Sequence, residues 1–213
     1  MVVTARVRWA VWGLAVLVGV GAGVGAIAAR GGSHPAPAPP VGGPAATWTA
    51  GERRAPAFAL ADENGKRVSL SAYRGRPVIL TFLDPLCRDY CPVEARRLSA
   101  LERSLPASSR PAIVAVSVNV FGNARRYLVE DEHEWTVTPQ WRWAVGGGGE
   151  LARVWRQYGI GVSVTTKKVA GITVRSVVHT EAAYLIDAQG FERALFLWPF
   201  TQADVGSALA GLR

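Results

Sequence analysis

Cysteine and histidine are scarce in this 213-residue chain, which contains two cysteines and three histidines. Two cysteines are too few for a disulfide-rich scaffold, and by number alone they suggest one structural disulfide. No internal repeat is present. The chain is long enough, and with 49% hydrophobic residues apolar enough, to bury the core of one globular domain and still carry segments outside it.

Acidic residues are missing from the first part of the chain, because none of the 16 precedes Glu52. The net charge of +8 is compatible with nucleic acid, anionic lipid or acidic protein as a partner. No basic-aromatic motif for nucleic acid is present, so we expect no nucleic-acid partner. The run Gly146–Gly149 is not followed by Gly-Lys-Ser/Thr. We therefore expect it to be a flexible connection and not a phosphate-binding loop.

A long segment without charge, Trp9–Ala29, lies near the N-terminus. As a helix it is long enough to cross the hydrocarbon core of a bilayer. Arg6 and Arg8 precede it, which favours a cytoplasmic N-terminus and export of the rest. The alternative is a cleaved signal peptide with Ala26–Ala28 at the cleavage site, but its apolar run is usually only ~7–15 residues. We therefore expect residues 1–32 to be an uncut transmembrane anchor.

Residues 33–53 are rich in Pro, Ala and Gly and include the run Pro35–Pro40. Such a composition favours an extended, semi-rigid spacer and builds no core. His34 lies in this linker, where we expect it to be solvated. The globular domain is therefore expected to span residues 54–213.

Hydrophobic patterns within 54–213 predict alternating strands and helices. Val78–Leu83 is a continuous β-branched and aromatic run, which is typical of a strand buried on both faces. Thr201 and Asp204 form the pattern of a capping box at the start of the last helix. The order of the expected strands and helices predicts an α/β domain of thioredoxin-like architecture with a mixed central sheet flanked by helices. The expected strands are 58–60, 68–70, 78–83, 112–118, 141–145, 183–186 and 194–197, and the expected helices are 92–104, 124–134, 150–158 and one from 201.

The two cysteines form a C-x-x-x-C pair, Cys87 and Cys91, between the strand Val78–Leu83 and the next helix. On one helical turn, residues at i and i+4 face the same way with Cβ atoms ~5–6 Å apart. Both thiols are then expected close to free backbone N–H groups at the helix N-terminus, which lower a thiol pKa. Because thiolate is the reactive and the metal-binding form, the pair suits disulfide exchange and metal binding alike.

Three roles for this pair are open, namely a structural staple, disulfide exchange and metal binding. A structural staple across so short a loop gains little chain entropy. Two thiolates bind Cu(I) linearly, and an imidazole completes a trigonal site, because soft sulfur ligands select Cu(I), zinc or Fe–S centres. Zinc prefers a fourth ligand, and the sequence offers no candidate near the motif.

Two further histidines lie in the expected domain. His133 is surrounded by four acidic residues in the expected helix 124–134, and we expect it on the solvated face. His179 lies directly before the expected strand 183–186, whose entrance borders the cysteine loop in a thioredoxin-like sheet. This placement makes His179 the expected third metal ligand, although a histidine in an apolar stretch is more often a packed core residue.

Several of these motifs together resemble one known family. Their order and spacing are similar to those of the Sco/SenC family of copper-binding proteins, over approximately residues 56–212. The motifs that carry the resemblance are Val78–Leu83, Cys87-x-x-x-Cys91-Pro92, Val178-His179-Thr180, Ala183–Asp187 and Gly190.

The resemblance implies a role for each of these residues. Cys87, Cys91 and His179 become ligands for copper, chiefly Cu(I), with Cu(II) as the second oxidation state. The implied function is a metallochaperone that delivers copper to cytochrome c oxidase subunit II or another cuproprotein, or keeps its cysteines reduced. With the anchor, the implied location is the bacterial plasma membrane, spanned once, with the domain on the extracytoplasmic side.

The chain departs from the family pattern at three places. Asp84-Pro85 replaces the usual aromatic residue and Thr before the first cysteine, and Arg88 replaces the frequent Pro after it. The family's acidic residues after the second buried strand are absent around Asn119. The ligands are unaffected, but recognition of the partner and the tuning of copper are expected to differ.

The main alternative function is that of a membrane-anchored thiol–disulfide oxidoreductase. Thioredoxins use C-x-x-C with a cis-proline facing it, whereas no proline lies between Gly159 and Asp187 and Val178-His179 takes that place. A peroxiredoxin needs Thr or Ser where Asp84 stands. A purely structural or interaction module is the third possibility. The alternating stretch 162–178, with Lys167, Lys168 and Arg175, predicts an exposed hairpin or a basic docking arm.

Overall fold

The computed structural model describes residues 42–212 of the chain. The anchor predicted at 1–32 lies outside the described residues, and so does the part of the predicted linker from residue 33 to residue 41. Within 42–212, no helix combines the length and the apolar character needed to cross a membrane.

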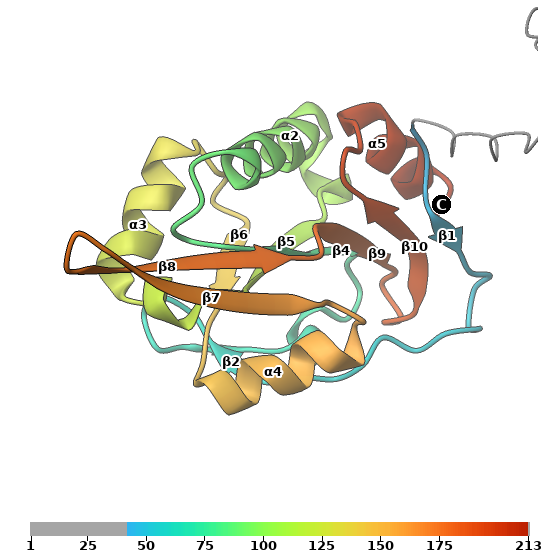
Figure 1. Ribbon diagram of the computed structural model, residues 1–213. Coiled ribbons are helices and arrows are strands. Elements are labelled where there is room, and N and C mark those ends of the chain that lie inside the picture. The colour runs from blue at the N-terminus through green and yellow to red at the C-terminus, as the bar shows by residue number, and fades with distance from the viewer. Residues whose placement is uncertain (1–41, 213) are drawn as a thin grey trace, which may run out of the picture. The chain divides into compact units, whose positions relative to one another are not determined.

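A six-stranded mixed sheet forms the centre of the domain (Figure 1). Strands β4, β5 and β6 are parallel to one another, whereas β9, β10 and β1 continue the sheet with antiparallel pairs. This confirms the predicted α/β architecture with a mixed central sheet. In spatial order the strands are β1 (Ala46–Thr47), β10 (Glu192–Leu197), β9 (Ala182–Ile186), β4 (Val78–Leu83), β5 (Ala112–Ser117) and β6 (Trp141–Ala144).

Helices cover both faces of this sheet, with α2 and α5 on one side and α4 on the other (Figure 1). Leu128 of α3 packs in the same apolar cluster as α2 and α5. The four predicted helices are confirmed, with ends that differ by a few residues. Their bounds are α2 (Tyr90–Ser104), α3 (Arg125–Glu134), α4 (Gly148–Gln157) and α5 (Gln202–Ala210).

The central strand β4 is buried along its whole length, as its uninterrupted apolar sequence predicts. Alternate side chains point to opposite faces of a strand, so Leu80 and Phe82 join the cluster under α4, and Ile79 and Leu83 join the cluster under α2. Thr81, the one polar residue of the strand, points toward the α2 face. There its hydroxyl donates a hydrogen bond to Glu94.

The first strands of the domain are shorter than predicted. The expected strands 58–60 and 68–70 are reduced to a two-residue ladder of β2 (Leu60–Ala61) and β3 (Arg67–Val68). A single 3-10 turn, Leu70–Tyr73, replaces the end of the second. The Asp62 carboxylate between the strands accepts the N–H groups of Asn64 and Lys66 at 2.8 and 2.7 Å. It therefore closes the turn between the two strands.

The alternating stretch forms a separate two-stranded hairpin of β7 (Val162–Val169) and β8 (Ile172–His179). Pairing runs from Val162 opposite His179 to Val169 opposite Ile172, and most of its residues are exposed. The predicted exposed hairpin is therefore confirmed. His179 is the last residue of β8, where the chain turns back toward the central strand β9 (Figure 1).

Residues directly before position 54 also join the folded unit. β1 lies within the range 33–53 and pairs with β10, Ala46 opposite Leu195. Arg53 forms an ion pair of 2.6 Å with Glu192, whose side chain is fully buried. A strand of two residues is too short to produce a recognisable alternation, which explains why composition alone placed these residues with the linker.

Candidate metal and thiol site

The two cysteines lie at the junction between β4 and α2. Cys91 is the second residue of α2, but Cys87 precedes the helix, whose N-cap is Asp89. The prediction that both cysteines share a helical turn is therefore wrong for Cys87, because a turn closed by the Cys87 N–H on the Asp84 carbonyl, at 3.0 Å, comes first. The Cys87 sulfur nevertheless accepts the Cys91 N–H at 3.5 Å, and both thiols are free.

The Cys87 thiol is half-buried and strongly acidic. Its pKa is lowered to about 6 by a hydrogen bond from the Cys91 thiol, with burial opposing, and by the backbone N–H groups of Cys91, Asp89 and Tyr90. Unpaired N–H groups at a helix start stabilise a negative charge. Cys87 is therefore a thiolate at neutral pH, as its position predicts.

Cys91 behaves in the opposite way. Its side chain is only 1% exposed. Its pKa is raised by its hydrogen bond to Cys87, by burial and by the negative charge of Cys87. The prediction of two acidified thiols is thus wrong for Cys91, because two neighbouring anions in a buried place repel each other. The resting pair consists of one half-buried thiolate and one buried thiol.

A hydrogen-bond bridge holds the cysteine loop to the end of β5. The buried Asp84 carboxylate accepts the Leu86 N–H at 2.7 Å and the Asn119 side-chain amide at 2.9 Å. The side-chain Oδ1 of Asn119 in turn accepts the Phe121 N–H at 3.0 Å. Asn119 therefore pairs with the Asp84 carboxylate, so two of the residues that depart from the expected family pattern contact each other.

Arg88, the third departure, fastens the loop to α3. Its guanidinium donates to the carbonyl groups of Pro85 and Cys87 at 3.1 and 3.0 Å and to Asp131 at 3.1 Å. Asp131 is fully buried. Burial raises the pKa of Asp131 to about 7 although Arg88 lowers it. Arg88, one of the three residues between the two cysteines, therefore anchors the loop.

The structure brings His179 to the cysteine loop, as predicted. The donor atoms of Cys91, His179 and Glu181 all lie within 4.8 Å of one another. Glu181 was not predicted, and the expectation that no further ligand lies near the motif is wrong. Residues i and i+2 of an extended chain face the same side, so the spacing from His179 to Glu181 was the available signal.

His179 is oriented by its own neighbour. Its Nδ1 lies 3.1 Å from the carbonyl oxygen of Thr180. A proton on Nδ1 satisfies this contact and leaves the lone pair of Nε2 free, which is the usual arrangement of a metal-binding imidazole. The ring also lines an open hollow of about 410 Å³ at the base of the hairpin. The other lining residues are Gly161, Val162, Ser163, Val178 and Thr180.

A second unpredicted carboxyl group, Glu94, lies under the site. It is 1% exposed on the buried face of α2, one turn after Cys91. Burial raises its pKa to about 8, and the hydrogen bond from Thr81 opposes this shift. The charges of Glu181 and Cys87 raise this pKa further. Glu94 is therefore mostly protonated at neutral pH and adds little negative charge beneath the cysteines.

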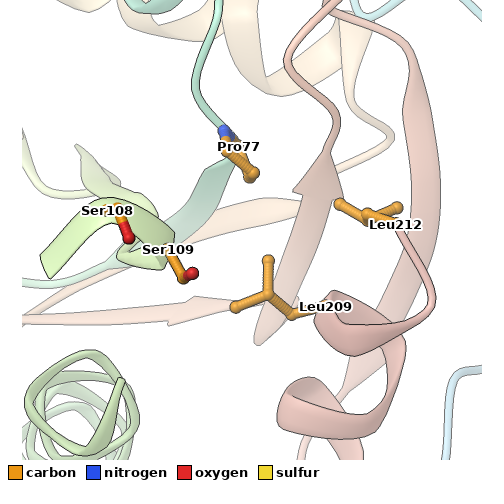
Figure 2. A pocket seen from close by; sticks show the side chains of 5 residues that line it. All are labelled: Pro77, Ser108, Ser109, Leu209 and Leu212. Atoms are coloured by element: carbon orange, nitrogen blue, oxygen red, sulfur yellow. The ribbon is translucent and has the colours of Figure 1, made fainter. Parts of the chain in front are cut away.

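The other motifs do not join this site. His133 is exposed on α3, as predicted. The N–H of Gly147 donates to the carboxylate of Glu150 at 2.8 Å, so a residue of α4 itself occupies the helix N-terminus after the glycine run. A pocket of about 290 Å³ lies at the start of β4, at the end opposite the cysteines (Figure 2). It is lined by the uncharged residues Pro77, Ser108, Ser109, Leu209 and Leu212.

Comparison with solved structures relates this arrangement to known proteins. Copper-bound ScoI of Bradyrhizobium japonicum is 21% identical with a TM-score of 0.64, covering 75% of this chain and 99% of that one. Copper-bound yeast Sco1 is 17% identical with a TM-score of 0.65, covering 75% and 87%. BsSco, a Sco-family cytochrome c oxidase assembly protein with a disulfide switch, is 18% identical with a TM-score of 0.58, covering 75% and 93%. These likenesses show a shared thioredoxin-like fold.

Sequence comparison defines the relationship more closely. No curated protein sequence matches the chain significantly. The sequence profile of the SCO1/SenC family matches residues 47–210, which include the cysteine loop, His179 and every strand of the central sheet except the first residue of β1. The chain therefore belongs to the SCO1/SenC family.

Proposed function

We propose that this protein is a copper-binding metallochaperone that holds Cu(I) between Cys87, Cys91 and His179. It delivers the ion to the copper site of cytochrome c oxidase subunit II or of another cuproprotein. The N-terminal segment 1–32 anchors it in the bacterial plasma membrane, with the domain on the extracytoplasmic side. Copper-bound relatives of the same fold, such as yeast Sco1, support the choice of metal.

One observation carries the proposal. The sulfur of Cys91 and a ring nitrogen of His179 lie within 4.8 Å of each other although the residues are far apart in the chain. The sulfur of Cys87 contacts the backbone N–H of Cys91 at 3.5 Å. The Cys87 sulfur is not among the donor atoms within 4.8 Å of one another, but it belongs to the same loop as Cys91. Two soft sulfur donors and one imidazole are a donor set that suits Cu(I).

The protonation states of the three residues fit this role. Cys87 has a pKa of about 6 and is ready to bind as a thiolate. Cys91 gives up its proton when the ion arrives, since a bound cation removes the repulsion between the two sulfur charges. His179 binds through Nε2 as a neutral imidazole. Binding is therefore expected to release about one proton from the cysteine pair.

The surface around Cys87 supports transfer to a partner protein. Leu86 and Tyr90, on either side of it in the chain, are 39% and 57% exposed, and Phe121 is 46% exposed. Exposed apolar side chains gathered around a reactive group are typical of protein-binding surfaces. Arg175 of the hairpin stacks on the Phe121 ring at 4.6 Å, so the basic hairpin borders the same surface. An acceptor docked there receives copper by ligand exchange with Cys87.

Cu(I) titration of the reduced protein against a competing chelator tests the proposal. We expect one tight site that weakens about 10-fold or more in His179→Ala, because loss of the imidazole leaves only the two sulfur donors. Cys87→Ser should weaken binding further, since a hydroxyl is a poor ligand for this soft ion.

His133→Ala is the matched control, because His133 is exposed on α3 and far from the cysteine motif in sequence. It should bind Cu(I) as tightly as the unmodified protein. Equal binding by His179→Ala and the unmodified protein removes His179 from the ligand set. Absence of any tight Cu(I) site rejects the copper function as a whole.

The asymmetry of the two thiols favours a second candidate function, that of a thiol–disulfide oxidoreductase. The half-buried Cys87 thiolate attacks a partner disulfide and forms a mixed disulfide, and one partner thiolate leaves. The buried Cys91 then loses its proton and attacks Cys87, which releases the second partner thiolate and leaves a Cys87–Cys91 disulfide. The partner is reduced by two electrons and the cysteine pair is oxidised by two.

The pH dependence of alkylation tests this asymmetry. The rate of iodoacetamide modification of Cys87 should rise with pH with a midpoint near 6, well below the usual thiol range. Cys91 should remain unmodified in the folded protein because it is buried. A single rise near the ordinary thiol pKa contradicts the attacking role of Cys87.

A further inference from the structure

We infer that Glu181 is a fourth donor of this site, which a divalent ion engages and Cu(I) does not. The inference deepens the proposed function and rests on it for the other three donors, Cys87, Cys91 and His179. It gives the site two modes, a three-donor mode for the monovalent ion and a four-donor mode for Zn(II) or Cu(II).

The position of the carboxylate carries the inference. A carboxylate oxygen of Glu181 lies within 4.8 Å of both the Cys91 sulfur and a His179 ring nitrogen. Donor atoms at this spacing need only small side-chain rotations to meet on one ion. Within residues 42–212, no ion pair engages the Glu181 carboxylate. The carboxylate therefore faces the other donors without a cation of its own.

The backbone fixes Glu181 on the same side as His179. Thr180 separates the two residues in an extended connection from β8 to β9, and alternate residues of an extended chain share a face. The Glu181 carbonyl accepts the N–H of Trp198 at 3.1 Å, which ties this connection to the chain after β10. The backbone that carries the Glu181 carboxylate is therefore fixed by a hydrogen bond.

Charge decides which ion uses the fourth donor. Two thiolates and a neutral imidazole already give a Cu(I) site a net negative charge, and a nearby carboxylate adds repulsion in a half-buried place. A divalent ion neutralises the two thiolates and attracts the third anion. Zn(II) also prefers four ligands, and carboxylate oxygen is among those it accepts. The donor set of two sulfurs, one nitrogen and one oxygen is complete for such an ion.

Zn(II) and Co(II) are suitable probes because neither oxidises the cysteine pair. With the full-length reduced protein, Glu181→Gln should weaken Zn(II) binding about 10-fold or more, since the amide oxygen is a far weaker donor. The visible bands of bound Co(II), which report four-coordination, should lose intensity in this variant. Cu(I) affinity, measured in parallel against a chelator, should not weaken, because the variant removes only a charge that repels this site.

Glu130→Gln is the control, since it removes an equal charge from an exposed side chain of α3 outside the cysteine loop. It should leave Zn(II) affinity and the Co(II) spectrum unchanged. Equal loss in both variants overturns the inference, because the effect is then one of charge and not of coordination. Unchanged Zn(II) binding in Glu181→Gln overturns it as well.

The Cu(I) measurement separates the two proposals. Tight, His179-dependent Cu(I) binding with Zn(II) binding insensitive to Glu181 rejects the fourth donor and retains the copper function. Loss of Zn(II) binding in Glu181→Gln, without any tight Cu(I) site in the unmodified protein, retains the four-donor site and rejects the copper function. Thermal unfolding of the metal-free variants, which should match that of the unmodified protein, shows that the differences are not due to misfolding.

Discussion

At the scale of single residues, the site depends on which acidic groups carry charge. Cys87 is ionised near neutral pH, whereas its hydrogen bond to Cys87 and burial keep Cys91 protonated. Burial raises the pKa of Glu94 to about 8. Negative charge is therefore concentrated on the sulfur atom that a partner can reach. A charged Glu94 would repel the thiolate from below, so its protonated state helps to keep the Cys87 pKa low.

Glu94 also predicts a pH dependence of stability. An unfolded glutamate loses its proton near 4.5, but the folded one retains it to about 8, so the folded state binds more protons between these values. Stability should therefore fall as pH rises through this range, by at most about 1.4 kcal/mol per pH unit from this group. Glu94→Gln retains an acceptor for Thr81 and cannot ionise. Urea unfolding should show that this variant gains stability relative to the unmodified protein as pH rises from 5 to 8.

A stability difference between the two proteins that stays constant over this pH range contradicts a raised pKa of Glu94 in the folded state. Glu130→Gln on the solvated helix α3 is a control, because an exposed carboxylate in a helix interior contributes little to this dependence.

At the scale of elements, the cysteine loop is held by polar contacts to two neighbours. Asp84 and Asn119 join it to the end of β5, and Arg88 and Asp131 join it to α3. The loop carries no regular hydrogen-bond ladder between β4 and α2, so these side chains replace one. The loop can thus present Cys87 at a fixed place without burying it.

The Asp84–Asn119 contact gives a prediction about charge. Asn119→Asp places a second carboxylate against the buried Asp84, and two such groups cannot both ionise cheaply. We expect a loss of at least about 2 kcal/mol of unfolding free energy at pH 7. The loss should shrink as pH falls from 7 toward about 4, because the folded pair takes up a proton at a higher pH than an unfolded aspartate does, and the protonated group can donate the hydrogen bond.

Asn119→Ala serves as the comparison, since it removes the same hydrogen bonds without adding charge. Its loss of stability, measured by urea unfolding, should not shrink at low pH in this way. Similar pH profiles for the two variants are incompatible with charge repulsion between residues 84 and 119.

At the scale of the whole molecule, the segment before residue 54 closes one edge of the sheet. β1 adds to β10, and the chain then continues to Arg53, which pairs with the fully buried Glu192. Burial raises the pKa of Glu192, and Arg53 opposes this. The buried Glu192 carboxylate is therefore paired with a cation, Arg53, from the segment before residue 54.

Arg53→Ala should destabilise the domain because it leaves the Glu192 carboxylate buried and unpaired. About half of the Arg53 side chain is exposed, so we expect about 1–3 kcal/mol and less than for a fully buried pair. Arg53→Ala combined with Glu192→Gln should recover part of the loss. Urea unfolding of the two variants measures both values, and equal stability of the single and double variants contradicts an unpaired buried charge.

The amino-acid sequence by itself determined the order and type of most elements. Val78–Leu83 is recognisable as a buried strand because the run is short and rich in β-branched and aromatic residues. Thr201 and Asp204 cap the last helix through contacts only three residues apart. The C-x-x-x-C pair and His179 were recognisable for the same reason. Their spacing, and their place at the ends of predicted strands, are local properties of the chain.

Tertiary structure decided how the donors differ and which others join them. The thiol pKa values of Cys87 and Cys91 diverge because one sulfur is buried and hydrogen-bonded to the other. Glu94 lies under the site because it occupies the buried face of α2, and Glu181 lies beside Cys91 because β9 pairs with β4. Burial and contacts between distant segments set these properties, and neither is contained in the local pattern of residues.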